Sequence, residues 1–247
     1  MISTRFDTLF SSLSGGLIPT AFLRVLSFHE SSLNPDAVTP SSHATGLFQT
    51  TQTVIDEYNL HHGTKHTLED AKDPTLSTKI GTELLAQIVS GYRKNHPRSL
   101  ATNWADPRFI GLLVAGFNAG YSERGGVGKV VGELERAGIP AERITVDTVA
   151  QAAKSAGASK YLSQPDRLRY WKAVTASYLK EIAKTEPEVI HFVIPPKGRE
   201  DKVYVPVPMG NIVALMLLPL GAIFWANKLK KKRKKSWQPS TLSALSL

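Results

Sequence analysis

The 247-residue sequence contains no cysteine, which excludes both a disulfide framework and a metal site built from thiolates. Excess charge of one sign is also scarce outside a single short segment. The formal net charge is +9, but the run KLKKKRKK at residues 228–235 carries seven positive charges, so 9 − 7 leaves only +2 for the rest of the chain. A nucleic-acid-binding surface over the main part of the protein is therefore not predicted.

A long apolar run is missing near the N-terminus, where Asp7 and Arg24 interrupt the candidates, so we expect no secretory signal peptide. Charged residues are absent from residues 203–227. Within this stretch, residues 209–226 read MGNIVALMLLPLGAIFWA and as a helix would span about 27 Å, close to the hydrocarbon thickness of a bilayer. The sequence therefore predicts a single C-terminal transmembrane helix at residues 207–227.

A basic tail, residues 228–247, follows the predicted membrane helix. Its positive charges favour the cytoplasmic side of a membrane or its equivalent, and residues 228–235 could also contact anionic lipid or packaged nucleic acid. The alternative interpretation is a buried core helix followed by a nuclear or nucleic-acid-binding tail. Residues 185–206 are Pro-rich and are typical of a linker, which favours the membrane interpretation.

Apolar residues recur at helical spacing through most of residues 15–184, and strand-like alternation is scarce there. Pro19 and the Asp106-Pro107 pair are start signals for two of the expected helices. The segments expected to be helical are residues 19–30, 51–58, 74–94, 107–118, 129–138, 146–157 and 164–184. We therefore predict a mainly α fold, with an N-terminal arm at residues 1–14 and a globular helical domain at residues 15–184.

Glu30 is an acidic residue in an apolar setting. Leu23, Leu26 and Glu30 are spaced by three and four residues, so they share one helix face near the end of that helix. Burial and the negative end of the helix dipole both favour the protonated carboxyl group, and a carboxylic acid that stays protonated near neutral pH suits general acid catalysis. The alternative is a buried structural ion pair with an Arg or Lys.

Three segments carry a family resemblance: ESSLNP at residues 30–35, ATGLFQ at residues 44–49 and GFNAG at residues 116–120. Together with an intervening Asp-Pro-initiated helix that contains a central glycine, Gly81, they resemble in order the signature segments of lytic transglycosylases with a soluble, goose-lysozyme-like catalytic domain. Two positions depart from the family pattern, because the chain has Phe where the family has Met and Phe where it has Tyr. These positions are Phe48 and Phe117.

The resemblance implies a lysozyme-like domain that cleaves the bond between N-acetylmuramic acid and N-acetylglucosamine in a peptidoglycan glycan strand and forms 1,6-anhydromuramoyl ends. Glu30 would be the catalytic residue, and no metal or other cofactor is expected. The residues expected to bind substrate are Ser31, Gly46, Leu47, Phe48, Gln49, Phe117, Asn118, Ala119 and Tyr121. For Asn118, a helix C-cap role is an equal alternative.

No acidic residue lies between Asp36 and Asp56, the stretch in which goose-type lysozymes place a second carboxylate, and this favours a transglycosylase. Two alternatives stay open: a muramidase of the same fold that uses water, and a non-enzymatic envelope or virion component with a degenerate domain. The resemblance extends to the membrane-anchored, wall-digesting enzymes of membrane-containing bacteriophages. We therefore expect a single-pass protein of a virion membrane that digests the cell wall locally during viral entry, or alternatively of a bacterial inner membrane with a periplasmic catalytic domain.

Overall fold

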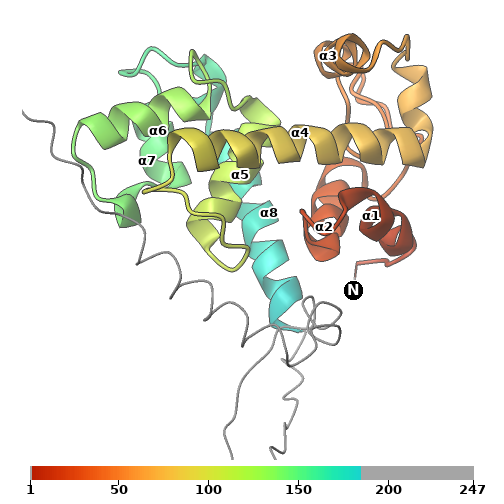
Figure 1. The fold of residues 1–247 in the computed structure, drawn as a ribbon, viewed down its shortest axis with the longest axis horizontal. Helices are drawn as coiled ribbons and strands as arrows, with labels where there is room; N and C mark the ends of the chain where they lie inside the picture. The colour runs from red at the N-terminus through yellow and green to blue at the C-terminus, as the bar shows by residue number, and fades with distance from the viewer. Residues whose placement is uncertain (1, 185–247) are drawn as a thin grey trace, which may run out of the picture. The chain divides into compact units, whose positions relative to one another are not determined.

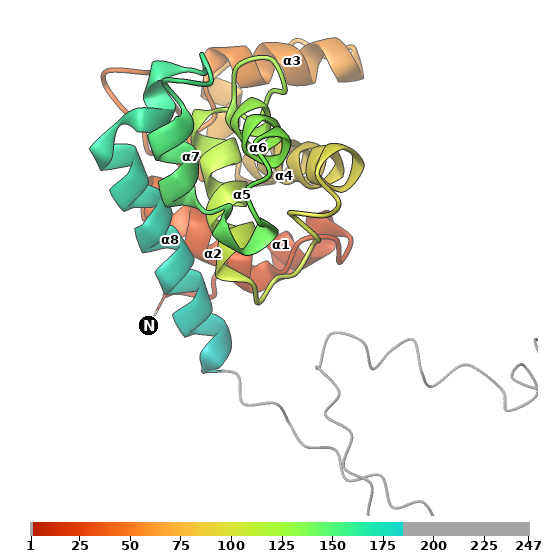
Figure 2. The ribbon, with the colours of Figure 1, turned by 90° about the vertical axis from the view of Figure 1, so that its left-hand side faces the viewer.

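The computed structural model describes residues 2–184. This part of the chain contains eight α-helices and three short 3-10 helices, joined by loops (Figures 1 and 2). The α-helices are α1 (Asp7–Ser14), α2 (Thr20–Ser31), α3 (Gln52–His62), α4 (Pro74–Asn95), α5 (Pro107–Ala119), α6 (Val127–Arg136), α7 (Val146–Ala152) and α8 (Pro165–Ala183). The 3-10 helices are η1 (Glu69–Lys72), η2 (Ala141–Arg143) and η3 (Lys160–Ser163). The prediction of a mainly α fold is confirmed.

Asp-Pro pairs begin the two helices at the centre of the fold. The Asp73 carboxylate accepts a hydrogen bond from the Thr75 amide at 2.9 Å, and the Asp106 carboxylate accepts one from the Arg108 amide at 2.8 Å. Each proline follows at the first helical position, where it costs no internal hydrogen bond. The start of α5 predicted from the Asp106-Pro107 pair is therefore confirmed.

Helix α5 forms the centre of the core. Every residue from Phe109 to Gly116 is buried, and the helix packs against α8, α4, α6 and α7. Helix α4 crosses the molecule in Figure 1, with α6 and α7 near one of its ends and α1 to α3 near the other. On α8, Trp171 and Tyr178 are fully buried. The C-terminal end of α5 lines a cleft.

The first fourteen residues, expected as an arm, include α1. Phe10 on this helix is completely buried and its ring packs edge-on against the Phe48 ring, with 5.7 Å between ring centroids. Asp7 forms an ion pair with Arg24 of α2. Residues 2–14 are thus packed into the same compact unit as the helices that follow. Helix α1 is short and lacks a capping side chain, so its sequence carries little local signal.

Three predicted segments, the linker at residues 185–206, the membrane helix at residues 207–227 and the basic tail at residues 228–247, lie outside the described residues. Within residues 2–184, none of the helices is both long enough and apolar enough to span a bilayer.

Candidate active site

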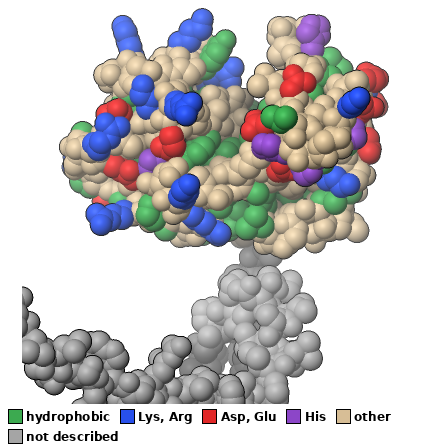
Figure 3. Space-filling model, turned by 45° about the horizontal axis from the view of Figure 1, so that its top comes forward, with side chains coloured by type: hydrophobic (Ala, Val, Ile, Leu, Met, Phe, Trp, Pro, Cys, Tyr) green, Lys and Arg blue, Asp and Glu red, His purple; other side chains and the backbone are tan. Residues whose placement is uncertain are grey.

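A cleft of about 720 Å³ lies above α4, and Figure 3 shows this face of the molecule hollowed between two lobes. Its walls come from the end of α2, the loop before α3, α3 itself, the middle of α4, the end of α5 and the start of α8. All three sequence motifs contribute to it. The predicted site residues that line the cleft are Glu30, Phe48, Gln49, Phe117, Asn118 and Tyr121.

Glu30 occupies the last turn of α2 and opens onto the cleft. Burial raises the pKa of its carboxyl group from the ordinary value of 4.5 to about 7, because surrounding protein replaces the water that would solvate the charge. Two groups act in the opposite direction: the Tyr170 hydroxyl, which donates a hydrogen bond to Glu30 Oε1, and the Arg167 guanidinium. The carboxyl group is thus poised to exist in both protonation states near neutral pH.

Helix α8 also fixes Asn118 at the end of α5. The Asn118 Oδ1 atom accepts hydrogen bonds from Arg167 Nη1 at 2.7 Å and from Trp171 Nε1 at 3.1 Å. Arg167 Nη1 also donates to the Asn118 carbonyl oxygen at 3.2 Å. Because both partners only donate, these contacts fix which side of the amide is oxygen.

Ser31 links the first motif to the second. Its hydroxyl is buried and lies 3.0 Å from the Leu47 carbonyl oxygen and 3.1 Å from the Ser27 carbonyl oxygen. The Leu47 side chain is fully buried in the core and does not line the cleft. These two residues thus position the neighbouring cleft residues, and their predicted contacts with substrate stay untested.

Gln49 braces the loop that forms one wall of the cleft. Its Nε2 atom donates to the Ala37 carbonyl at 3.2 Å and to the Gly46 carbonyl at 3.1 Å, and its Oε1 atom accepts from the Thr39 hydroxyl at 2.6 Å. Both amide hydrogens of Gln49 are therefore used within the protein. The side chain can still accept a hydrogen bond from a ligand through Oε1, but it has no hydrogen left to donate.

Two glycines permit close packing beneath the cleft. Gly46 has φ +83°, and a Cβ atom there would lie 2.0 Å from the Ala71 carbonyl oxygen, so no other residue fits. At Gly81 on α4, an added Cβ would lie 2.7 Å from Cγ of the Phe48 ring. The central glycine of α4 and the Phe that replaces the family's Met are therefore in direct contact, and Phe48 provides an apolar wall.

The third motif provides an aromatic wall. Phe117 and Tyr121 line the cleft, whereas Ala119 does not. The Tyr121 hydroxyl accepts a hydrogen bond from Asn95 Nδ2 at 3.0 Å, and its ring packs edge-on against Tyr92 with 5.0 Å between centroids. The end of α4 therefore fixes the position of Tyr121.

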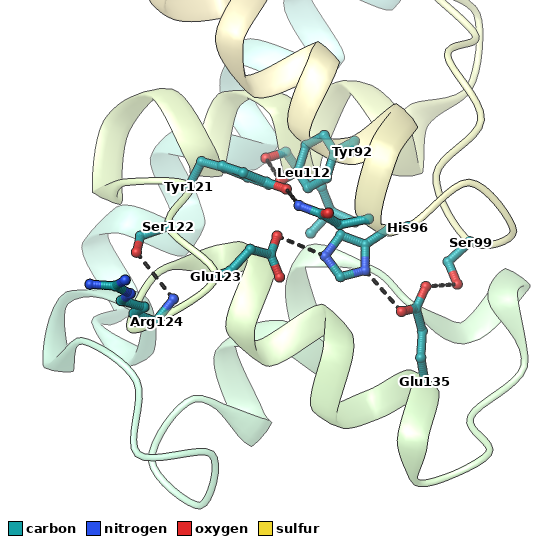
Figure 4. A network of polar contacts seen from close by, with 10 residues as sticks. Tyr92, His96, Ser99, Leu112, Tyr121, Ser122, Glu123, Arg124 and Glu135 are labelled. Atoms are coloured by element: carbon teal, nitrogen blue, oxygen red, sulfur yellow. Dashed lines mark hydrogen bonds and ion pairs between the residues drawn. The ribbon is translucent and has the colours of Figure 1, made fainter.

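A buried histidine secures the loop that follows Tyr121 (Figure 4). His96 is only 3% exposed, and its Nδ1 lies 2.8 Å from Glu135 Oε2 while its Nε2 lies 3.0 Å from Glu123 Oε1. The Ser99 hydroxyl donates to the other Glu135 oxygen at 2.5 Å. This network of polar contacts joins the end of α4, the loop before α6, and α6 itself.

Four residues that the sequence motifs did not indicate also belong to this site: Tyr170, Arg167, Trp171 and Glu57. The first three lie on α8 and act on Glu30 or Asn118 through the contacts above. Glu57 lies on α3, is exposed and lines the cleft. A second carboxylate therefore lines the cleft together with Glu30, and it comes from just beyond the acid-free stretch between Asp36 and Asp56. Among residues 2–184, no group of three or more His, Asp and Glu residues is arranged to bind a metal ion.

One family model covers all three sequence motifs. Residues 14–135 match the family model described as Transglycosylase SLT domain. None of the curated proteins matches the chain. Among solved structures, the 70 kDa soluble lytic transglycosylase from Escherichia coli is similar at 19% sequence identity and a TM-score of 0.49, over 73% of this chain and 25% of that one. The present chain thus spans about a quarter of the length of that enzyme.

Proposed function

We propose that the transglycosylase SLT domain of this chain, completed by α8, is a peptidoglycan lytic transglycosylase in which Glu30 acts first as acid and then as base. Protonated Glu30 donates its proton to the oxygen that bridges N-acetylmuramic acid and N-acetylglucosamine, and the C1–O bond breaks. The substrate's acetamido group stabilises the positive C1. The C6 hydroxyl then attacks C1 and returns its proton to Glu30, so no water is consumed and a 1,6-anhydro ring forms.

The observation that carries this proposal is the state of Glu30. Its pKa of about 7 leaves a substantial protonated fraction at neutral pH, and the same group can still accept a proton after the bond breaks. The Tyr170 hydroxyl and the Arg167 guanidinium stabilise the carboxylate form that follows proton donation. Asn118, Phe117 and Tyr121 line the same cleft, which supports their proposed contact with the sugar rings.

Digestion of purified peptidoglycan sacculi tests the proposal. Wild-type protein should release 1,6-anhydromuropeptides, identified by mass spectrometry, and Glu30→Gln should fold normally and release none. Equal release by the two proteins would refute the role of Glu30. If neither protein releases products, the non-enzymatic alternative holds instead.

A muramidase is the second candidate, because Glu57 gives the cleft a further carboxylate. In that reaction water attacks C1, and each product is heavier by one water molecule and has a reducible end. Glu57→Gln distinguishes the two: a lytic transglycosylase should keep its anhydro products in this variant, whereas a hydrolase that relies on Glu57 should lose activity.

We further propose that residues 209–226 anchor the enzyme in a membrane, with the catalytic domain and residues 228–235 on opposite sides. The proposal is supported by the length of the charge-free run and by the basic run that follows it. Protease protection in sealed vesicles, with a tag at each end, tests it. Digestion of both tags without detergent would exclude a spanning helix.

The setting proposed for this enzyme is a virion membrane, from which it would open the cell wall locally during phage entry. A bacterial inner membrane with a periplasmic catalytic domain is the alternative. Antibody detection of the protein in purified virus particles, against detection in uninfected cell membranes, separates the two settings.

A further inference from the structure

The two halves of the catalytic unit carry opposite formal charge. Residues 2–92 contain five Lys and Arg and nine Asp and Glu, so 5 − 9 gives −4. Residues 93–184 contain fifteen Lys and Arg and eight Asp and Glu, so 15 − 8 gives +7. In Figure 3 the Lys and Arg side chains gather mainly on one side of the hollow. A ligand in the cleft therefore meets a positive field on that side.

Four cations on the positive side have no carboxylate partner in the described part of the chain. Within residues 2–184 none of them forms an ion pair, although other cations of the same half do. We call these four the basic surface: Arg124, Lys129, Lys160 and Arg167. The nearby acids are already engaged, since Glu123 contacts His96 and Asp166 contacts Arg169. The positive charge of Arg124, Lys129 and Lys160 is therefore not neutralised by these acids, and Arg167 adds its charge at the edge of the cleft.

The segments that carry the basic surface are joined to one another. The Ser159 amide, next to Lys160, donates to the Gly125 carbonyl oxygen at 2.8 Å. Lys129 Nζ donates to the Gly157 carbonyl oxygen at 3.2 Å. These contacts bring the loop before α6, the start of α6 and the segment before η3 together on one surface.

An exposed aromatic ring connects the basic surface to the cleft. Tyr161 is 46% exposed, and its ring centroid lies 5.7 Å from Lys160 Nζ and 5.0 Å from Arg167 Cζ. Arg167 also lines the cleft. A polymer that leaves the cleft past Arg167 would therefore meet the exposed Tyr161 side chain together with the two cations that lie over its ring.

We propose that the basic surface binds the free carboxylates of the peptide stems attached to the glycan strand in the cleft. This inference rests on the proposed function, because it takes peptidoglycan as the substrate. The sugars in the cleft are uncharged, whereas the stems bring carboxylates at regular intervals along the same polymer. Lys and Arg side chains form charge-assisted hydrogen bonds with carboxylates, and at an exposed site these contacts weaken as salt is added. The enzyme would thus prefer peptide-bearing strands.

The test compares two substrates and two triple variants. The substrates are sacculi free of teichoic acid and the same sacculi after their carboxylates are converted to amides. The first variant, Arg124→Gln/Lys129→Gln/Lys160→Gln, removes three charges of the basic surface and leaves Arg167 in the cleft unchanged. The matched control, Arg136→Gln/Arg169→Gln/Lys172→Gln, removes the same charge from cations that have carboxylate partners.

At low ionic strength the first variant should have a KM about threefold to tenfold above wild type on native sacculi, with kcat unchanged. On amidated sacculi the two proteins should have the same KM, which also shows that the variant is folded. Added salt should raise the KM of the wild type more than that of the first variant, which keeps only Arg167 of the basic surface. The control variant should match the wild type throughout.

Equal KM values for wild type and the first variant on native sacculi would overturn the inference, as would a defect of equal size on amidated sacculi. A defect that requires teichoic acid in the sacculi, or binding to vesicles of phosphatidylglycerol that the variant loses, would assign the surface to phosphate anions and refute the peptide-stem proposal. Absence of product from every substrate would instead refute the proposed function itself.

Discussion

Replacing Glu30 by Gln should make the protein more stable at alkaline pH while abolishing activity. The folded state holds the Glu30 pKa at about 7, compared with an ordinary value of 4.5. Below pH 4.5 the Glu30 carboxyl group is protonated in both the folded and the unfolded state, so it does not change the free energy of unfolding. Between pH 4.5 and 7 the unfolded chain ionises and the folded chain does not, so the folded state binds more protons and stability falls as pH rises. Above pH 7 the loss is complete.

The size of this effect follows from the gap between the two pKa values. At ~1.36 kcal/mol per pKa unit, the ionised carboxylate costs the folded state about 3 kcal/mol at pH 8. Glutamine cannot ionise and has a similar shape, so Glu30→Gln should recover an amount on the order of 3 kcal/mol at pH 8 and close to none at pH 4.

Urea unfolding followed by circular dichroism, at pH 4, 6 and 8, measures this pH dependence. Glu57→Gln is the matched control, because it makes the same change at a carboxylate that lines the same cleft but is exposed. If Glu30→Gln shows the same free energy of unfolding relative to wild type at pH 4 and pH 8, then Glu30 is not desolvated and the argument for its acid role is wrong.

Three further predictions follow from contacts around the cleft. Tyr170→Phe removes a hydrogen bond that lowers the pKa of the catalytic acid, so the alkaline limb of the pH–rate profile should move to higher pH; an unmoved limb would show that the hydroxyl has no influence. Gly46→Ala should lower the free energy of unfolding by roughly 2–4 kcal/mol in urea titrations, because it combines positive φ with a backbone clash. Gly15→Ala, with positive φ in open space, should cost clearly less. His96→Gln should raise KM for sacculi with little change in kcat, because it frees the loop that carries Tyr121; a lowered kcat at constant KM would contradict this positioning role.

The helical fold and the apolar setting of Glu30 could be predicted from local sequence, because each depends on neighbours a few residues away. Asp-Pro pairs begin α4 and α5, and the spacing of Leu23, Leu26 and Glu30 places them on one face of α2. The family motifs then placed Phe48 and Asn118 in the same cleft as Glu30. These signals predict the helices correctly because capping and helical periodicity depend on residues close together in the sequence.

The contribution of α8 could not be predicted in the same way. Tyr170 lies 140 positions from Glu30 in the chain, and on its own helix it is one polar aromatic residue among charged neighbours. Only the packing of α8 against α2 and α5 brings its hydroxyl to the carboxyl group. Helix α1 was missed because its eight residues lack a capping side chain, and its position depends on the burial of Phe10.

The fixed amide of Asn118 determines what kind of atom a sugar must offer at that point of the cleft. Arg167 and Trp171 both donate to its oxygen, so the group left to face a ligand is the NH2, which can only donate. A carbonyl oxygen satisfies such a donor without any rotation of a hydroxyl group. We therefore expect residues of a glycan strand that carry an acetamido carbonyl to bind at this position. A glycan whose amino groups have lost their acetyl groups should bind less well, because it presents an ammonium donor to the same NH2.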